Sequence, residues 1–201
     1  MINCLEDVER LSQIVRALLL LSQAESGQLA LQKTRLDLAA ALADVVDQFQ
    51  IPFEGAKVRL VADLAECTAW MDRVQIERMV SNLLSNALKF TPAGGEVRVG
   101  LKCDAASVEI SVEDTGCGIP TDHLPHIFNR FYRVPGADAG PNPERGLGLG
   151  LSFVAWIAKA HGGTVHVDST PGKGTRFSIT LPLESGVPAA ISPASVAAIS
   201  G

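Results

Sequence analysis

One short segment, residues 81–89 with the sequence SNLLSNALK, places the strongest constraint on how this chain folds. Asn82, Asn86 and Lys89 recur at i, i+4 and i+7, so in a helix their side chains share one face. The rest of that helix is an apolar stripe that needs a core: Ile76, Met79, Val80, Leu83, Leu84, Ala87 and Leu88. The pattern predicts a helix packed on a core, with one row of polar side chains along its edge.

The polar row on this helix allows two interpretations. Asparagine is a poor helix former, so two of them one turn apart need an explanation. Amide carbonyls are hard, neutral oxygen ligands that suit Mg²⁺, with water and substrate phosphates as its other ligands. A lysine one turn further on can meet phosphate oxygens as a point charge. The alternative is two buried asparagines bonded to the backbone beside a lysine whose head reaches solvent.

The composition is that of an ordinary globular protein. Of the 201 residues, 47% are hydrophobic and 19% are charged, and the net charge is −5. These values exclude the basic composition of a nucleic-acid-binding protein and the low hydrophobicity of a disordered chain. The four cysteines, at positions 4, 67, 103 and 117, lack metal-ligand spacing, so we expect reduced cytosolic thiols. No apolar run reaches the roughly 18 residues that span a membrane.

Residues 4–23 are predicted to form one long helix. Two apolar seams run along it, one from Val8, Leu11, Val15 and Leu18 and the other from Ile14 and Leu21. Two seams suit a helix that is buried in a bundle. We therefore expect partner helices, supplied by a second copy of the chain; a helix docked on the surface of its own domain is the alternative.

Residues 32–184 are predicted to form one compact domain. Asp37 and Asp72 are expected to cap helices over 38–49 and up to 90, and a third helix ends at 160. Strands are expected over 58–62, 68–71, 96–102, 107–113, 164–168 and 175–183. This order predicts an α+β fold, a two-layer α/β sandwich with three helices on a mixed, mainly antiparallel sheet. Residues 185–201, rich in Ala, Ser and Pro, are predicted to be a disordered tail.

The periodic pattern is lost between residues 120 and 145. A long loop without secondary structure inside a compact domain is usually a lid or a disordered segment. Within it, residues 127–133 (IFNRFYR) combine aromatic and basic side chains. The rings can anchor a lid, while Arg130 or Arg133 stabilises charge on a transferring phosphoryl group. A short amphipathic turn with solvated arginines is the alternative.

Two glycine-rich motifs flank this loop. Asp114 begins DTGCGI (114–119) after a predicted strand, and its carboxylate can accept a hydrogen bond from an exocyclic amine such as that of adenine. Glycine lets a backbone approach a planar ring closely, although Asp and Gly are equally typical of ordinary turns. Residues 146–151 (GLGLGL) precede a helix, where backbone N–H groups can bind phosphates. A flexible hinge is the alternative for this second motif.

The histidines are not expected to be catalytic. We expect His161, at a helix end, to interact with the terminal carbonyls. His166 is expected to be a half-buried strand residue. His123 and His126 lie in the predicted lid and form no clear metal set.

Taken in order and spacing, five motifs resemble the N, G1, F, G2 and G3 boxes of sensor histidine kinases. They are SNLLSNALKF, DTGCGIP, IFNRFYR, GLGLGLSFV with HGG, and PGKGTRFSITLP. The resemblance covers residues 36–183 and implies the ATPase fold that these kinases share with gyrase and mismatch-repair ATPases. Residues 4–31 look like the second helix of that family's dimerisation and histidine-phosphotransfer domain.

The resemblance implies ATP and Mg²⁺ as cofactors. It places Mg²⁺ at Asn86 with Asn82 nearby, phosphate at Lys89, and the nucleotide near Phe90. The adenine amine would meet Asp114, in a pocket shaped by Gly116, Gly118 and Ile119 and closed by Thr175. The phosphates would lie along Gly146, Leu147, Gly148, Leu149 and Gly150, and Arg130 and Arg133 would act from the lid. Leu147 departs from the family, which often has Thr, Ser or Ala there, so a hydroxyl contact to phosphate would be lost.

The resemblance also implies a phosphoryl acceptor that this chain does not show. In the family the acceptor histidine lies on the first bundle helix beside an acidic residue, and none of the four histidines here has that context. We expect a cytoplasmic fragment of a longer receptor, or a protein that lost its acceptor, with membrane contact only through missing segments. It would bind ATP without autophosphorylating in cis.

The expected activity is transfer of the γ-phosphoryl of ATP to a histidine on a separate bundle helix, for relay to a response regulator. The intact receptor would be a homodimer, and no nucleic-acid partner is expected. Two alternatives are a non-catalytic nucleotide-responsive binding module and a protein-serine kinase of the anti-sigma type. The two-seam helix argues against the second of these.

Overall fold

The structure is a computed structural model that describes residues 30–135 and 147–183. The predicted helix at 4–23, the predicted tail at 185–201 and Gly146 lie outside the described residues. In chain order the elements are β1 (Thr34–Asp37), α2 (Leu38–Gly55), β2 (Arg59–Leu64), β3 (Thr68–Met71), α3 (Arg73–Phe90), β4 (Glu96–Cys103), β5 (Ser107–Asp114), a 3-10 helix η1 (Thr121–His126), α4 (Gly150–Ala160), β6 (Thr164–Thr170) and β7 (Gly174–Pro182).

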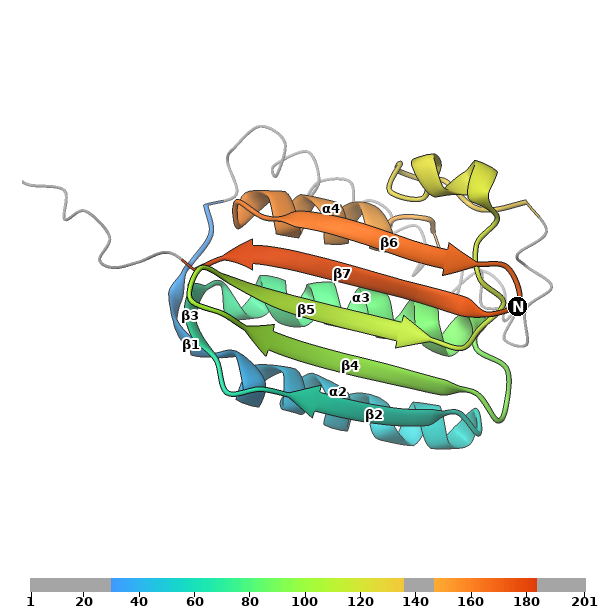
Figure 1. The fold of residues 1–201 in the computed structure, drawn as a ribbon, viewed down its shortest axis with the longest axis horizontal. Coiled ribbons are helices and arrows are strands. Elements are labelled where there is room, and N and C mark those ends of the chain that lie inside the picture. The colour runs from blue at the N-terminus through green and yellow to red at the C-terminus, as the bar shows by residue number, and fades with distance from the viewer. Residues whose placement is uncertain (1–29, 136–146, 184–201) are drawn as a thin grey trace, which may run out of the picture.

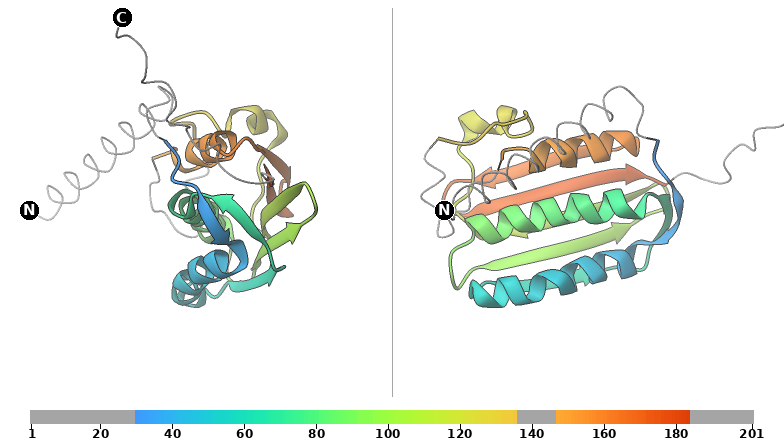
Figure 2. Two further views of the ribbon diagram at one scale, coloured as in Figure 1. Left: turned by 90° about the vertical axis from the view of Figure 1, so that its left-hand side faces the viewer. Right: turned by 180° about the vertical axis from the view of Figure 1, so that it is seen from behind.

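The described elements form two layers (Figures 1 and 2). Three helices, α2, α3 and α4, cover one face of a five-stranded sheet of order β2-β4-β5-β7-β6. Only β2 and β4 are parallel; the other neighbours in this sheet are antiparallel. Strands β1 and β3 form a separate antiparallel pair. The predicted α/β sandwich with a mixed, mainly antiparallel sheet is confirmed.

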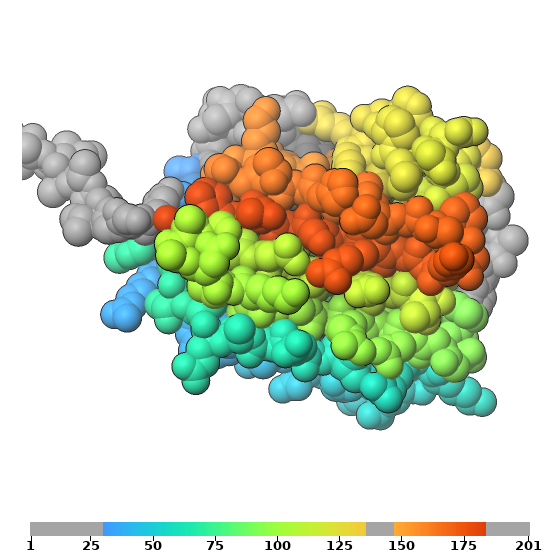
Figure 3. All heavy atoms as spheres, in the orientation of Figure 1, coloured from blue at the N-terminus to red at the C-terminus, as the bar shows by residue number. Residues whose placement is uncertain are grey.

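The core lies between the helices and the inner face of the sheet. The apolar stripe of α3 is almost fully buried there, as its spacing predicted. Alternate residues of the central strands, Val97 and Val99 on β4 and Ile110 and Val112 on β5, are also buried. No helix covers the opposite face in the part of the chain that the structure describes, and Figure 3 views this face. There the intervening residues are mostly charged, among them Arg98, Lys102, Glu109 and Glu113, so that face can meet water without a covering layer.

Both predicted helix caps are present. The Asp37 carboxylate accepts a hydrogen bond from the N–H of Ala40 at 3.0 Å, and the Asp72 carboxylate accepts one from the N–H of Gln75 at 3.2 Å. Helix α3 ends at Phe90 as predicted, but the predicted end of α2 at residue 49 is wrong. The helix continues through Pro52 to Gly55, because Phe53 in its last turn is fully buried in the core. Tertiary packing here overrides a helix-breaking residue.

Three further features differ from the sequence prediction. Strand β1 was not predicted; it is a four-residue strand whose one buried side chain is Leu36. The described part of residues 120–145 is not without secondary structure, since it contains η1. His166 is not half-buried: 72% of its side chain is exposed, because it lies on the edge strand β6 and points away from the helices.

Candidate functional site

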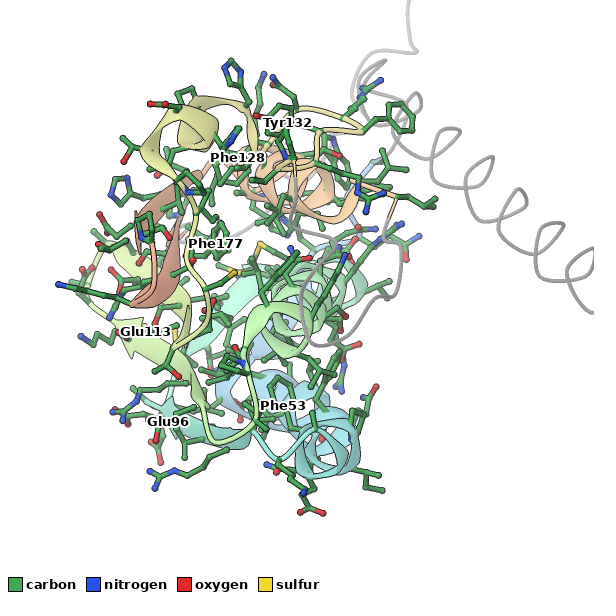
Figure 4. All side chains as sticks on the ribbon, turned by 90° about the vertical axis from the view of Figure 1, so that its right-hand side faces the viewer. Phe53, Glu96, Glu113, Phe128, Tyr132 and Phe177 are labelled. Carbon is green, nitrogen blue, oxygen red and sulfur yellow. The ribbon has the colours of Figure 1, made fainter. Side chains whose placement is uncertain are left out.

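A cavity of about 180 Å³ lies at the end of the domain where α3 and β5 finish and α4 begins. It brings together most of the residues that the sequence analysis selected: Asn86, Lys89, Phe90, Asp114, Gly118, Ile119, Arg133, Gly148 and Thr175. These come from five separate parts of the chain. Figure 4 looks onto this end of the sheet.

Six selected residues that the structure describes do not line the cavity: Asn82, Gly116, Arg130, Leu147, Leu149 and Gly150. Leu149 is buried in the core and Leu147 packs against it. Gly150, the first residue of α4, faces α3 so closely that a Cβ on it would lie 3.3 Å from the Asn82 amide oxygen. The amide nitrogen of Asn82 is buried and has no hydrogen-bond partner among residues 30–135 and 147–183. A buried donor without an acceptor costs free energy, and the described part of the chain offers no acceptor to the N–H₂ of Asn82.

Asp114 is the buried carboxyl of this cavity. It is the last residue of β5, pairs with Thr175 of β7, and is 9% exposed. Its Oδ1 accepts a hydrogen bond from the N–H of Gly116 at 2.8 Å. Burial raises the pKa of this carboxyl, while the backbone N–H groups of Gly116 and Thr175 act in the opposite direction. Burial therefore removes part of the solvation of the ionised carboxylate, and a ligand that donates a hydrogen bond to it would replace that lost solvation.

Glycines allow the segment after Asp114 to lie against its neighbours. Gly118 has φ +69°, and a Cβ on it would lie 2.2 Å from the carbonyl oxygen of Thr170. Gly174 has φ +120°, and a Cβ on it would lie 1.9 Å from the carbonyl oxygen of Asp114. Side chains at either position would push the β6–β7 turn away from the Asp114 segment. These two glycines thus allow the Asp114 segment and the β6–β7 turn to lie in close contact at one wall of the cavity.

The lid segment, which we define as residues 120–135, docks through its rings. Phe128 meets Phe177 of β7 edge-on, with ring centroids 6.4 Å apart, as Figure 4 shows. The Phe131 N–H donates to the carbonyl of Gly148 at 2.9 Å, and this contact joins the segment to the start of α4. The ring of Phe128 thus packs this segment against β7, and the role of the segment as a lid stays a prediction. Arg133 lines the cavity, whereas Arg130 does not.

The histidines of the lid segment are held by Tyr132. His123 Nδ1 and the Tyr132 hydroxyl are 2.6 Å apart, and the His126 ring lies 5.5 Å from the Tyr132 ring. Within residues 30–135 and 147–183, no group of three histidine, cysteine or acidic side chains is arranged to hold a metal ion. In the same ranges no helix is both long and apolar enough to cross a membrane.

The sequence analysis missed several residues of the cavity wall: Cys117, Ile127, Tyr132, Val134, Leu151 and Phe177. Most of them lie inside motifs that were recognised, so their positions carried a signal. Cys117 stands between the two glycines of DTGCGI, and Phe177 is an inward residue of an alternating strand. Side chains that line a cavity and those that fill a core follow the same apolar pattern, so periodicity cannot separate them.

Comparison with known proteins finds the same architecture elsewhere. The family model of the histidine kinase-, DNA gyrase B-, and HSP90-like ATPases matches residues 71–185. The sensor histidine kinase CusS of Escherichia coli is 40% identical over 183 residues, which cover 89% of this chain and 36% of CusS. The sensor histidine kinase RppB of Synechocystis is 39% identical over 181 residues, covering 87% of this chain and 38% of RppB. The chain thus spans little more than a third of these relatives.

The solved structures that resemble this chain also include histidine kinases. The histidine kinase AdeS of Acinetobacter baumannii superposes with a TM-score of 0.73 at 28% identity, over 90% of this chain and 82% of that one. Full-length ShkA in complex with AMPPNP gives a TM-score of 0.78 at 25% identity, over 91% of this chain and 38% of ShkA.

Proposed function

The chain belongs to the family of histidine kinase-, DNA gyrase B- and HSP90-like ATPases and carries the ATP-binding catalytic domain of a sensor histidine kinase. We propose that the cavity described above binds ATP together with Mg²⁺. The observation that supports the proposal is the composition of that one cavity. A buried carboxyl from β5, Asp114, shares it with the amide of Asn86 and the ammonium of Lys89 from α3.

The base of the nucleotide belongs at the Asp114 end of the cavity. The Asp114 carboxylate accepts a hydrogen bond from the exocyclic amine of adenine, which replaces the solvation lost on burial. Ile119 supplies an apolar surface beside it, and Thr175 closes the pocket. Gly116 holds Asp114 through its N–H, and Gly118 keeps this wall close to β6.

The phosphates belong near Asn86, Lys89 and the start of α4. Asn86 fits Mg²⁺ as a single neutral oxygen ligand, because this ion usually keeps waters and substrate phosphates as its other ligands. Bound there, Mg²⁺ would neutralise phosphate charge. Lys89 would meet phosphate oxygens directly, and Gly148 and the N-terminus of α4 would add backbone N–H donors. Asn82, whose N–H₂ has no acceptor among the described residues, would support this end of the site.

The chain's own residues position the reacting groups rather than form a covalent intermediate. Lys89, with Arg133 and Arg130 from the lid, would stabilise charge on the transferring phosphoryl group. The acceptor would be a histidine on a separate bundle helix, in the cytoplasmic part of an intact homodimeric receptor. That histidine would pass the phosphoryl group to a response regulator. His161 does not suit that role, because it is 3% exposed and both ring nitrogens are bonded.

A binding experiment tests the metal and nucleotide assignments together. ATP affinity is measured by titration calorimetry with Mg²⁺ and with a chelator, for the chain and for Asn86→Ala. We expect Mg²⁺ to strengthen binding in the chain but not in the variant. Ser85→Ala is the matched control, since Ser85 is the exposed neighbour of Asn86 on α3. Equal Mg²⁺ dependence in all three proteins would contradict the role of Asn86.

A labelling experiment tests phosphoryl transfer. The chain is incubated with Mg²⁺ and γ-labelled ATP, alone and with a separately supplied bundle that carries an acceptor histidine. We expect acid-labile label on the added bundle, none on the chain itself, and none with Asn86→Ala. Stable phosphohistidine on the chain alone would contradict the proposed acceptor. Tight ATP binding without label on either protein would favour a nucleotide-responsive binding module.

A further inference from the structure

Ser169 lies just outside the cavity, yet it contacts two of the elements that form its wall. It is a half-buried residue of β6 that does not line the cavity itself. Its hydroxyl oxygen accepts a hydrogen bond from the N–H of Ile119 at 2.8 Å and lies 3.0 Å from the carbonyl of Gly174. It also lies 2.8 Å from the hydroxyl oxygen of Thr175. Ile119 and Thr175 both line the cavity.

Counting protons fixes the direction of these three hydrogen bonds. A serine hydroxyl has one proton and two lone pairs. The Ile119 N–H can only donate, so it occupies one lone pair of Ser169. The Gly174 carbonyl can only accept, so it takes the single proton. One lone pair of Ser169 is left for Thr175, and the Thr175 hydroxyl must therefore donate to Ser169.

The direction of the last bond determines what Thr175 offers to a ligand. With its proton directed at Ser169, the Thr175 oxygen presents only lone pairs towards the cavity that it lines. Thr175 is the β-sheet partner of Asp114, whose carboxylate is also an acceptor. This edge of the cavity therefore presents two neighbouring acceptors. It suits a base, or a bridging water, that donates hydrogen bonds there, and it disfavours a base with a carbonyl at the same position.

We propose that Ser169 is a positioning residue for base selectivity: it orients the Thr175 hydroxyl as an acceptor, so that the cavity prefers a 6-amino purine over a 6-oxo purine. The inference rests on the proposed binding of ATP in this cavity. Ser169 itself would not touch the nucleotide. It acts through Thr175 and through the Ile119 N–H, which fixes the position of the Asp114 segment against β6.

The test compares ATP with inosine triphosphate (ITP), which differs by a carbonyl oxygen in place of the amine. In Ser169→Ala the Thr175 hydroxyl is free to turn and donate to that oxygen. We expect the ratio of ATP to ITP affinity, measured by titration calorimetry, to fall about three- to tenfold, the worth of one neutral hydrogen bond. Ser169→Thr keeps a hydroxyl and should restore the ratio.

Two further variants separate positioning from general loss of structure. Ser178→Ala removes a serine of β7 that bonds Arg176 at 3.3 Å and does not line the cavity, so it should leave the ratio unchanged. In a Thr175→Val background, Ser169→Ala should cause no further change in the ratio, because the group through which it acts is gone. An unchanged ratio in Ser169→Ala would overturn this inference alone. Failure of the unmodified chain to bind ATP would overturn it together with the proposed function.

Discussion

The imidazole of His161, at the end of α4, accepts a hydrogen bond at Nε2 from the backbone N–H of Asp72, 3.2 Å away at the start of α3. Because the backbone N–H must donate, Nε2 carries no proton, and the Nδ1 proton is directed at the carbonyl of Ile157, 2.9 Å away. This single neutral tautomer joins the two helices at the end opposite the cavity. Their other ends carry Asn86, Lys89 and Leu151 of the cavity wall.

Replacing His161 should destabilise the fold. His161→Ala leaves the N–H of Asp72 without this acceptor in a buried position and opens a small cavity, so we expect a loss of at least about 2 kcal/mol of unfolding free energy. Urea denaturation measures it. His166→Ala is the control, because most of that side chain is exposed, and it should change stability by no more than about 0.5 kcal/mol. Equal effects of the two substitutions would show that the contacts of His161 between α3 and α4 do not contribute to the free energy of unfolding.

The His161 junction illustrates what the sequence can predict. Its bond to Ile157 lies within one helical turn, and the prediction of a bond to the terminal carbonyls is confirmed. Its bond to Asp72 spans 89 residues and has no local signal. Local features of the fold were likewise predictable, whereas long-range ones were not. The caps at Asp37 and Asp72 were correctly predicted from local chemistry. The end of α2 was not, since burial of Phe53 decides it.

The candidate site also contains residues that the sequence predicts and residues that only the three-dimensional structure reveals. Motif order predicted residues from five parts of the chain, and the structure places Asn86, Lys89, Asp114 and Thr175 in one cavity. Ser169 was not predicted, because its partner Ile119 is 50 residues away in sequence and becomes a neighbour only when β5 and β6 both pair with β7. Residues that act through a hydrogen bond to a site residue leave no pattern of their own in a single sequence. The roles assigned to these side chains remain predictions until they are measured.

Asp114→Asn should separate stability from nucleotide binding. Burial raises the pKa of the Asp114 carboxyl in the folded chain. The carboxyl therefore favours folding below its ordinary pKa, and that contribution is lost as the pH rises through the raised value. Above the raised pKa the buried charge is unfavourable, so there the variant should be as stable as the chain or more stable, and the difference should vanish in acid. Urea denaturation across pH measures this.

The same substitution should weaken ATP binding on the order of 10- to 100-fold, the worth of one charge-assisted hydrogen bond. For the unmodified chain, ATP affinity should fall as the pH drops through the raised pKa and the carboxylate is neutralised. Glu113→Gln is the control, because Glu113 is the exposed neighbour that pairs with Arg176 at 3.3 Å. Full ATP affinity in Asp114→Asn would rule out Asp114 as the acceptor for the base.

Gly118→Ala and Gly172→Ala form a matched pair for the cavity wall. Both residues have positive φ, +69° and +76°, so each alanine should cost about 1–2 kcal/mol of backbone strain. At Gly118 the new Cβ would also meet backbone, 2.2 Å from the Thr170 oxygen, whereas a Cβ on Gly172 would have no atom of the described residues within 4 Å. We therefore expect Gly118→Ala alone to lower ATP affinity, with the larger loss of stability in denaturation. Similar losses in both variants would show that strain rather than packing requires the glycine.

The cysteines should report occupancy of the cavity without any substitution. Cys103 and Cys117 are exposed, whereas Cys67 is buried, and burial raises the pKa of its thiol to about 12. Burial also raises the pKa of Cys117, so among these three cysteines iodoacetamide at about pH 8 should modify Cys103 first, Cys117 more slowly and Cys67 hardly at all. Cys117 lines the cavity and Cys103 does not, so saturating ATP with Mg²⁺ should slow modification of Cys117 but not of Cys103, as measured by mass spectrometry of the labelled peptides. An unchanged rate at Cys117 would mean that the nucleotide does not occupy this cavity.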